Sequence, residues 1–336
     1  MKFEFRPLRP VDFDQCLSLM DDRFAHDPEQ LQAVPGFWLD ILQRGLGYGA
    51  VVFNPNEPKR ILAFGIRCFV DFDTADSFRN YEEPFLTRTM LDRWRTGKTP
   101  FLVEPDVGRA NADNGVNLFV AHWGMAMPWT GEVIGAVMPP LLQGFIAGSR
   151  GLNIRIIIQE VFYFPREVAN GLPVHIQELS SNHCDKTYPQ DAKPFLIITA
   201  REHVVPTEGN LFALSLFSPF EPPHLKLSRP QRDLLRTALI NDSDEWIAEI
   251  LDVSLSAVKK RWQSIYDIMS GGCPDAFPKN MALRDGQRGV EKRKYVLHYI
   301  RNHPEELHPY SPKGNSDYGE LDRQSFRELT GFRGEV

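Results

Sequence analysis

The chain has 336 residues, of which 42% are hydrophobic and 24% are charged. These proportions are those of an ordinary globular protein, and they exclude an intrinsically disordered chain, a collagen and a disulfide scaffold. The net charge of -6 also excludes a polycation that holds nucleic acid nonspecifically over its whole surface.

Nothing in the sequence directs the chain into or through a membrane. A run of about 18 apolar residues, which a transmembrane helix needs, is absent. The opening M-K-F-E-F-R is not followed by an apolar core of signal-peptide length. We therefore expect a cytoplasmic protein with no membrane partner.

The cysteines give no sign of a metal or disulfide framework. Cys16, Cys68, Cys184 and Cys273 are scattered and form no CxxC pair, which argues against a structural zinc site and against a secreted disulfide scaffold. We expect reduced thiols, no metal site and no cofactor.

The first 217 residues alternate between strand and helix patterns. Apolar residues at helical spacing predict helices around 13–20 and at 83–95 and 133–147. Alternating or β-branched runs predict strands at 3–8, 47–53, 60–70, 116–123, 153–164, 195–200 and 211–217. This alternation predicts an α/β (α+β) N-terminal domain over residues 1–217.

Three prolines within residues 218–223 predict a Pro-rich linker at 218–224, because proline denies the backbone donors that helices and sheets need. Short helical patterns follow, and they predict an all-α C-terminal domain at 225–310 before a polar tail at 311–336. Residues 225–310 carry 14 Lys and Arg against 12 Asp and Glu, which leaves a net charge of -8 on the rest of the chain. A polyanion would meet least repulsion at this C-terminal part.

Three or four short helices are predicted within residues 227–269, and the first three follow one another closely. Ser228 can cap the first helix, Ser243 the second and Ser254 the third, because a serine hydroxyl accepts a hydrogen bond from the free amides of a helix N-terminus. The second helix ends at Asp252, and the small Ala248 allows a close helix crossing. This pattern predicts a helix-turn-helix.

The third helix, residues 254–266, has an apolar and a polar side. Val258, Trp262, Ile265 and Tyr266 form the inward stripe. A recognition helix in the major groove needs hydrogen-bond donors on its other side. The candidate DNA-binding residues on that side are Ser256, Lys259, Lys260, Arg261 at its edge, Gln263 and Ser264.

The strings L-S-R-P-Q-R-D-L-L from Leu227, I-A-E-I-L-D-V-S from Ile247, A-V-K from Ala257 and I-Y from Ile265 resemble the LuxR/NarL-type DNA-binding domain. That family reads L-T-x-R-E-x-E-V-L, then E-I-A-x-x-L-x-x-S-x-x-T-V-K-x-H. Ala257 replaces the threonine of the family and thereby removes one phosphate contact.

The resemblance implies a transcriptional regulator that binds double-stranded DNA as a homodimer. It places Lys259, Lys260 and Gln263 at positions that meet DNA, with the N-terminal domain sensing a small-molecule ligand or a partner. The alternative is a small helical bundle whose basic side is merely solvated. A further basic helix at 291–310, with Lys292-Arg293-Lys294, either docks on this unit or contacts phosphate or a second copy.

The opening F-R-P-L-R-P-V-D-F-D from Phe5, followed by helix, hairpin, helix and strand, resembles the start of a GNAT-type acyltransferase over about the first 160 residues. That family binds the acetyl-CoA pyrophosphate with a Q/R-x-x-G-x-G/A loop. The equivalent residues 122–131 lack this pattern, and Pro128 removes an amide donor. We therefore expect a sensor domain with GNAT-like element order and assign no catalytic residue. An acyl-CoA-dependent N-acyltransferase with an accessory helical C-terminus is the alternative.

Other candidate sites have more ordinary interpretations. The glycines of 45–49 precede a strand, which is the wrong context for a dinucleotide loop and favours the start of a hairpin. His183-Cys184-Asp185 is interpreted as an exposed loop, and Glu104 and Glu160 as salt-bridged or solvated carboxylates rather than an acid or base. Trp123, Met125, Met127 and Trp129 either line an apolar ligand pocket or belong to the core.

Overall fold

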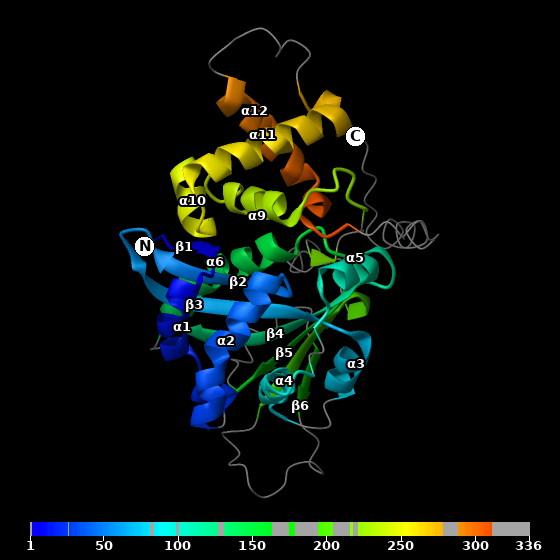
Figure 1. Cartoon of the computed structure of the whole chain (residues 1–336). Helices are drawn as coiled ribbons and strands as arrows, with labels where there is room; N and C mark the ends of the chain where they lie inside the picture. The colour runs from blue at the N-terminus through cyan, green and yellow to red at the C-terminus, as the bar shows by residue number, and fades with distance from the viewer. Residues whose placement is uncertain are drawn as a thin grey trace, which may run out of the picture.

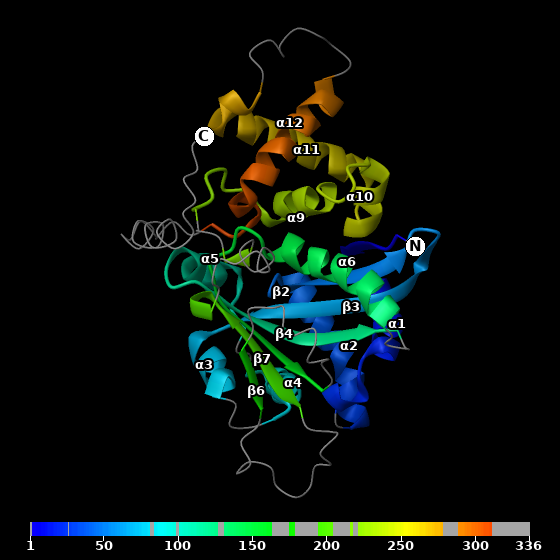
Figure 2. The ribbon, with the colours of Figure 1, turned by 180° about the vertical axis from the view of Figure 1, so that it is seen from behind.

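The structure of the chain is a computed structural model (Figure 1). It describes residues 2–25, 27–80, 84–98, 101–126, 131–162, 175–178, 194–203, 216–217, 221–277 and 288–310. A sheet covered by helices forms one part, here called the sheet region (residues 2–203). A group of C-terminal helices, the helical region (residues 225–308), is stacked on it (Figures 1 and 2).

The sheet region contains one mixed sheet, which confirms the α/β (α+β) prediction for this part of the chain. Its described strands follow the order β1-β2-β3-β4-β5-β7-β6. Only β4 and β5 run parallel, and every other neighbouring pair is antiparallel. The strands are β1 Glu4–Pro7, β2 Gly47–Asn54, β3 Glu57–Val70, β4 Val116–Met125, β5 Ile154–Val161, β6 His175–Glu178 and β7 Phe195–Ala200.

Successive side chains of each strand point to opposite faces of the sheet, and both faces are buried. Val51 of β2 belongs to the core cluster with Phe37 and Trp38, whereas the adjacent Val52 belongs to a cluster with Val137. Figures 1 and 2 show α1 (Phe13–Leu19) and α2 (Pro28–Arg44) on one face and α6 (Gly131–Ser149) on the other. The sheet is therefore sandwiched between two layers of helices.

The helix expected at 83–95 is α4, Leu86–Arg95. Three further helices were not predicted: α2, α3 (Phe72–Asn80) and α5 (Glu104–Ala112). The ends of α2 follow ordinary capping chemistry, since the Asp27 carboxylate accepts from the Gln30 amide at 2.8 Å and Gly45 ends the helix at a φ of 68°. The internal Pro35 interrupts the helical signal.

The strand expected at 211–217 is wrong for its described residues. Leu216 is helical and Phe217 lies in a bend, while residues 211–215 lie outside the described part of the chain. Both side chains are buried in a cluster with Val107 and Leu118. Their apolar character therefore reflects packing against the sheet region rather than strand pairing.

The helical region has its own apolar core, centred on Leu234, Ile247, Trp262 and Val296. Its main elements are α9 (Arg229–Ala238), α10 (Asp244–Leu251), α11 (Leu255–Gly272), α12 (Arg288–Asn302) and the short turn Pro304–Leu307. In Figures 1 and 2, α9 and α10 lie next to the sheet region, and α11 and α12 lie beyond them.

The expected linker at 218–224 is described only at 221–224, which form neither helix nor strand. Residues 311–336 lie outside the described part. The domain boundaries themselves remain a prediction. Within the described residues, every helix falls short of the combination of length and apolar character that a membrane crossing requires.

Candidate functional site

The connection between α10 and α11 is a tight turn with capped ends. Asp252 adopts a left-handed φ of 51°, and the Val253 amide donates back to Ala248 O at 3.0 Å. The Ser254 hydroxyl then accepts from the Ala257 amide at 3.2 Å and begins α11. The caps predicted at Ser243 and Ser254 are both present.

The inward side of α11 is the predicted one. Val258, Trp262 and Ile265 are buried in the core of the helical region. Arg293 of α12 lies over the Trp262 ring at 4.7 Å and pairs with Asp244 of α10 at 2.7 Å. Arg293 therefore docks α12 on the helical region, which favours the docking interpretation of the basic run for this residue.

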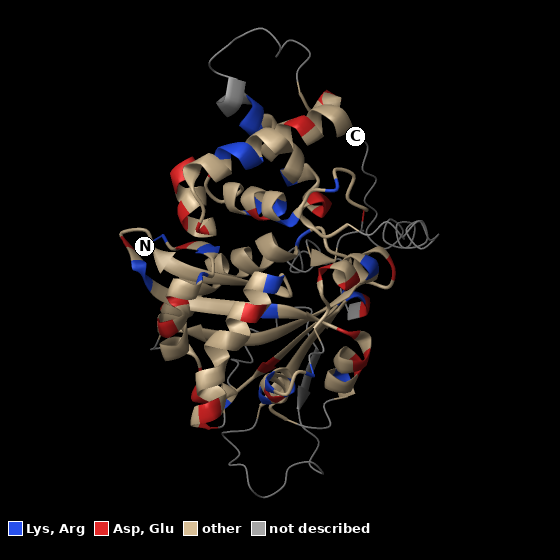
Figure 3. Ribbon diagram, in the orientation of Figure 1, with Lys and Arg blue, Asp and Glu red and all other residues tan. Residues whose placement is uncertain are grey.

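The predicted DNA-binding residues lie together on α11. Ser256, Lys259, Lys260, Gln263 and Ser264 are exposed, and Arg261 is half-buried. In Figure 3, Lys and Arg colour segments of α11 and α12, the two helices farther from the sheet. The two lysines form no hydrogen bond or ion pair within the described part of the chain.

Other members of this set are engaged by neighbours. The Gln263 side-chain amide donates to Asp267 Oδ1 at 2.9 Å, and the Ser264 hydroxyl accepts from Gln231 Nε2 at 2.9 Å. The Ser256 and Ser254 hydroxyls lie 2.9 Å apart. Lys259 and Lys260 are therefore the side chains of this set most available to a polyanion.

A second candidate site lies where β4 and β5 part. Their parallel pairing ends at Val120 and Gln159, although β4 continues to Met125. A cavity of about 410 Å³ lies beyond this point, lined by Asp21, Trp123, Met125, Phe162 and their neighbours. Trp123 and Met125 line this pocket and also belong to the core, since Met125 is buried in a core cluster and Trp123 packs against the main one, so both interpretations hold for these two residues. Met127 and Trp129 lie outside the described residues.

Two titratable groups beside this cavity, His122 and Asp21, are poorly suited to act as a general base. His122 is buried, its Nδ1 accepts from Trp38 Nε1 at 3.1 Å, and burial lowers its pKa to about 3. Burial would raise the pKa of Asp21, but hydrogen bonds from Arg23 hold it below its usual value. A base needs a pKa nearer the working pH.

The two carboxylates singled out in the sequence have structural partners. Glu160 is fully buried in β5, and its Oε1 accepts from the Phe85 amide at 2.6 Å. Phe85 has a φ of 66°, so this bond supports a left-handed turn before α4. Glu104, at the start of α5, pairs with Arg232 of α9.

Glycines 45–49 have backbone roles. Gly45 ends α2, and a Cβ on Gly47 would collide with Arg67 O, in agreement with the start of a hairpin. His183-Cys184-Asp185 lies outside the described residues. The described residues contain no group of three or more His, Cys, Asp and Glu that could hold a metal ion.

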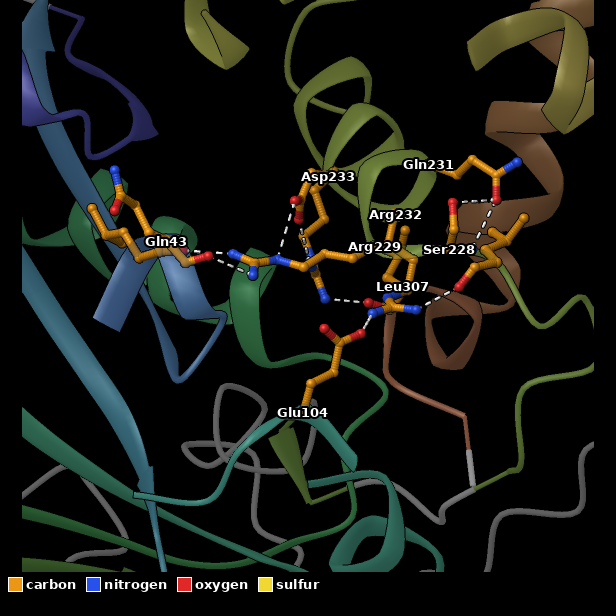
Figure 4. A network of polar contacts seen from close by, with 11 residues as sticks. Gln43, Glu104, Ser228, Arg229, Gln231, Arg232, Asp233 and Leu307 are labelled. Carbon is orange, nitrogen blue, oxygen red and sulfur yellow. Dashed lines mark hydrogen bonds and ion pairs between the residues drawn. The ribbon is translucent and has the colours of Figure 1, made fainter. Parts of the chain in front are cut away.

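Sequence reasoning missed the arginines that face the sheet region from α9 (Figure 4). Arg229 donates to Leu42 O and Gln43 O, both at 2.6 Å, and so satisfies carbonyls at the end of α2. Arg232 pairs with Glu104, and Arg9 joins Glu249 of α10 at 3.0 Å. The spacing of Arg229, Arg232 and Arg236 by three and four residues was the available signal for a shared face.

Comparisons with known proteins give structural neighbours only, since no protein family and no curated protein matches the sequence. A polyamine N-acetyltransferase of Drosophila melanogaster has 16% identity and a TM-score of 0.32, over 59% of this chain and 100% of the enzyme. An acetyltransferase from Corynebacterium glutamicum, related to a histone acetyltransferase, has 16% identity and a TM-score of 0.33, over 59% of this chain and 95% of its own. The C-terminal condensation domain of Ebony has 14% identity and a TM-score of 0.34, over 60% and 99%. Scores this low assign no activity to this chain.

Proposed function

We propose that the chain is a sequence-specific transcriptional regulator of LuxR type, with α11 as the helix that enters the major groove. The observation that carries the proposal is the capped turn at Asp252–Ser254, after which α11 buries an apolar side and exposes Lys259 and Lys260. The sheet region would sense a small molecule or a partner.

The chemistry of α11 assigns different tasks to its side chains. Lys259 and Lys260 are free to neutralise phosphates or to bind guanine O6 and N7. Gln263 can read adenine only after it releases Asp267. Because one recognition helix reads few base pairs, a homodimer on paired half-sites would supply the specificity.

The test is the joint substitution Lys259→Ala and Lys260→Ala, measured on a duplex selected from random sequences. We expect weaker binding and a salt slope, d log K/d log [salt], that becomes shallower by about 1 for each lost phosphate contact. The matched control is Lys59→Ala with Lys98→Ala, two exposed lysines of the sheet region. Parent-like binding by the α11 double variant would refute the assignment of the recognition helix.

The second candidate function is an acyl-CoA-dependent N-acyltransferase, and the cavity where β4 and β5 part is the observation that favours it. A pocket at the carboxyl ends of parallel strands is a common ligand position in α/β proteins. Calorimetric titration with acetyl-CoA tests this function. Saturable binding would favour the acyltransferase function. An absence of binding at millimolar acetyl-CoA would exclude it and leave the regulator as the proposed function.

A further inference from the structure

A second cavity lies between the sheet region and the helical region. Its volume is about 200 Å³. Tyr48 and Arg67 line it from β2 and β3, and Arg236 and His308 line it from the helical region. The cavity is therefore lined by groups from both parts of the chain.

Positive charge dominates the lining. Arg67, Arg229, Arg232 and Arg236 all line the cavity, against the carboxylates of Glu104 and Asp233. Arg232 is paired with Glu104, and Arg236 binds Asp233 at 3.0 Å and also donates to Leu307 O. Arg229 is committed to the carbonyls at the end of α2 (Figure 4). Among the described residues, Arg67 therefore has no carboxylate partner.

Arg67 is an unusual residue in this setting. It is 2% exposed, and only its Nη2 has a hydrogen bond, to Gly148 O of α6. Its Nε and Nη1 are buried and have no partner among the described residues. A buried guanidinium with unsatisfied donors is costly unless an anion or an acceptor compensates it.

The surrounding groups add to this cost. Burial, and then the charge of Arg236, lower the pKa of Arg67 to about 9, so it still carries its charge at neutral pH. Burial and Arg236 likewise lower the pKa of His308, whose Nε2 donates to Arg150 O at 2.7 Å. Burial raises the pKa of Tyr48 to about 12. At neutral pH the lining thus offers guanidinium and phenol donors and one neutral imidazole.

We propose that this cavity binds a small oxyanion, a carboxylate or phosphate group of a small metabolite, held by Arg67 with Arg236 and Tyr48. Both anions suit the planar donor fork of a guanidinium. A cavity of about 200 Å³ has room for a single carboxylate or phosphate group. The aromatic rings of Tyr48 and Phe69 lie within 6 Å of the Arg67 guanidinium, at 5.9 and 5.3 Å, and pack around it.

An anion at this place would contact both parts of the chain at once. It would neutralise Arg67 of the sheet region and lie next to Arg236 of the helical region, which already binds Asp233, and so favour their docked arrangement. The proposed anion site depends only on the geometry of this cavity. An effect of the anion on DNA affinity would in addition require that the chain binds DNA, as the proposed function states.

The test is calorimetric titration of the purified full chain with inorganic phosphate and, separately, with succinate, at fixed ionic strength in chloride. We expect saturable binding of at least one probe. Arg67→Met should weaken it tenfold or more, whereas Arg60→Met, on the exposed start of the same strand, should leave it unchanged. Binding of phosphate alone assigns a phosphorylated ligand, and binding of succinate alone assigns a carboxylate.

Thermal unfolding provides a second measurement in case Arg67→Met alters folding. The anion should raise the Tm of the parent, because a ligand that binds only the native state stabilises it, and it should raise the Tm of Arg67→Lys less. Arg67→Met without anion should be at least as stable as the parent without anion, since it removes an uncompensated charge. No saturable binding of either probe by the parent, or parent-like binding by Arg67→Met, overturns the proposal.

The variant with Lys259→Ala and Lys260→Ala separates the two proposals. It should bind the anion like the parent even if its DNA binding is lost. Anion binding without any DNA binding by the parent would refute the regulator and leave the anion site intact.

Discussion

Buried polar side chains in this protein are mostly held by partners far away in the sequence. The buried Thr87 hydroxyl donates to Ala121 O at 2.8 Å, 34 residues later in the sequence. Trp38 Nε1 donates to Nδ1 of His122, which lies 84 residues later in the sequence. The sequence displays such residues but not their pairing, because the contact exists only after the chain has folded. The role of Glu160 as an acceptor for the Phe85 amide was hidden for the same reason.

The buried histidines predict a loss of stability in acid. Burial lowers the pKa of His122 from 6.5 to about 3. Below about pH 6.5 the unfolded state therefore binds a proton that the native state does not. Stability should fall as the pH drops from about 6.5 toward 3, by about 1.4 kcal/mol per pH unit for each such histidine.

His122→Asn should remove one proton from this linkage, because asparagine does not titrate. The asparagine carbonyl can still accept the hydrogen bond from Trp38 Nε1. Urea unfolding of the parent and the variant between pH 6 and 4.5 should show a smaller pH slope in the variant. His298→Asn, an exposed control, should keep the parent slope. Equal slopes for the parent and His122→Asn would mean that His122 is already protonated in the native state.

At the scale of elements, local signals were the reliable ones. Ser243 and Ser254 begin their helices as predicted, because a cap acts within three residues of its own position. Six of the seven described strands were predicted from β-branched and alternating runs, but β6 was missed, and β3 begins at Glu57 rather than at residue 60. The missed residues, Glu57, Pro58 and Lys59, are exposed, two of them are charged, and proline is rare within strands, so they gave no strand signal.

The turn between α10 and α11 offers a test of the local backbone. Asp252 holds a φ of 51°, a left-handed conformation that costs most residues 1–2 kcal/mol and glycine very little. Asp252→Gly should stabilise the chain by about 1 kcal/mol or less, and Asp252→Val should destabilise it by about 1–2 kcal/mol. The urea unfolding midpoints of the parent and of these two variants give their order of stability. A destabilising glycine would show that the Asp252 side chain has its own role in the turn.

At the scale of the molecule, the sequence separated a sheet region from a helical region but did not show how they meet. The exposed side of α11 followed from helical spacing alone. The face of α9 that carries Arg229 and Arg232 did not, since its partners Leu42, Gln43 and Glu104 lie more than a hundred residues earlier. The cavity lined by Arg67 needs both parts in place, so no single segment could reveal it.

The ion pair between Glu104 and Arg232 joins the two regions, and its removal tests how much it contributes to holding them together. Arg232 is 4% exposed, and burial lowers its pKa to about 10. Glu104→Ala removes its carboxylate partner, and we expect a loss of about 1–3 kcal/mol in the free energy of unfolding with faster hydrogen exchange in α9. Glu57→Ala breaks an exposed ion pair and serves as the control. Unchanged exchange in α9 would show that the pair does not hold the two regions together.

The contacts made by Arg9, Arg229 and Arg232 have a mechanical consequence. Each joins a guanidinium to a carboxylate or to a backbone carbonyl, and such groups are readily hydrated when they separate. When these contacts break, each group exchanges its partner for water, and added salt should weaken first the ion pair between Arg9 and the exposed Glu249. The strength of the contact between the two regions should therefore depend on the ionic composition of the surroundings.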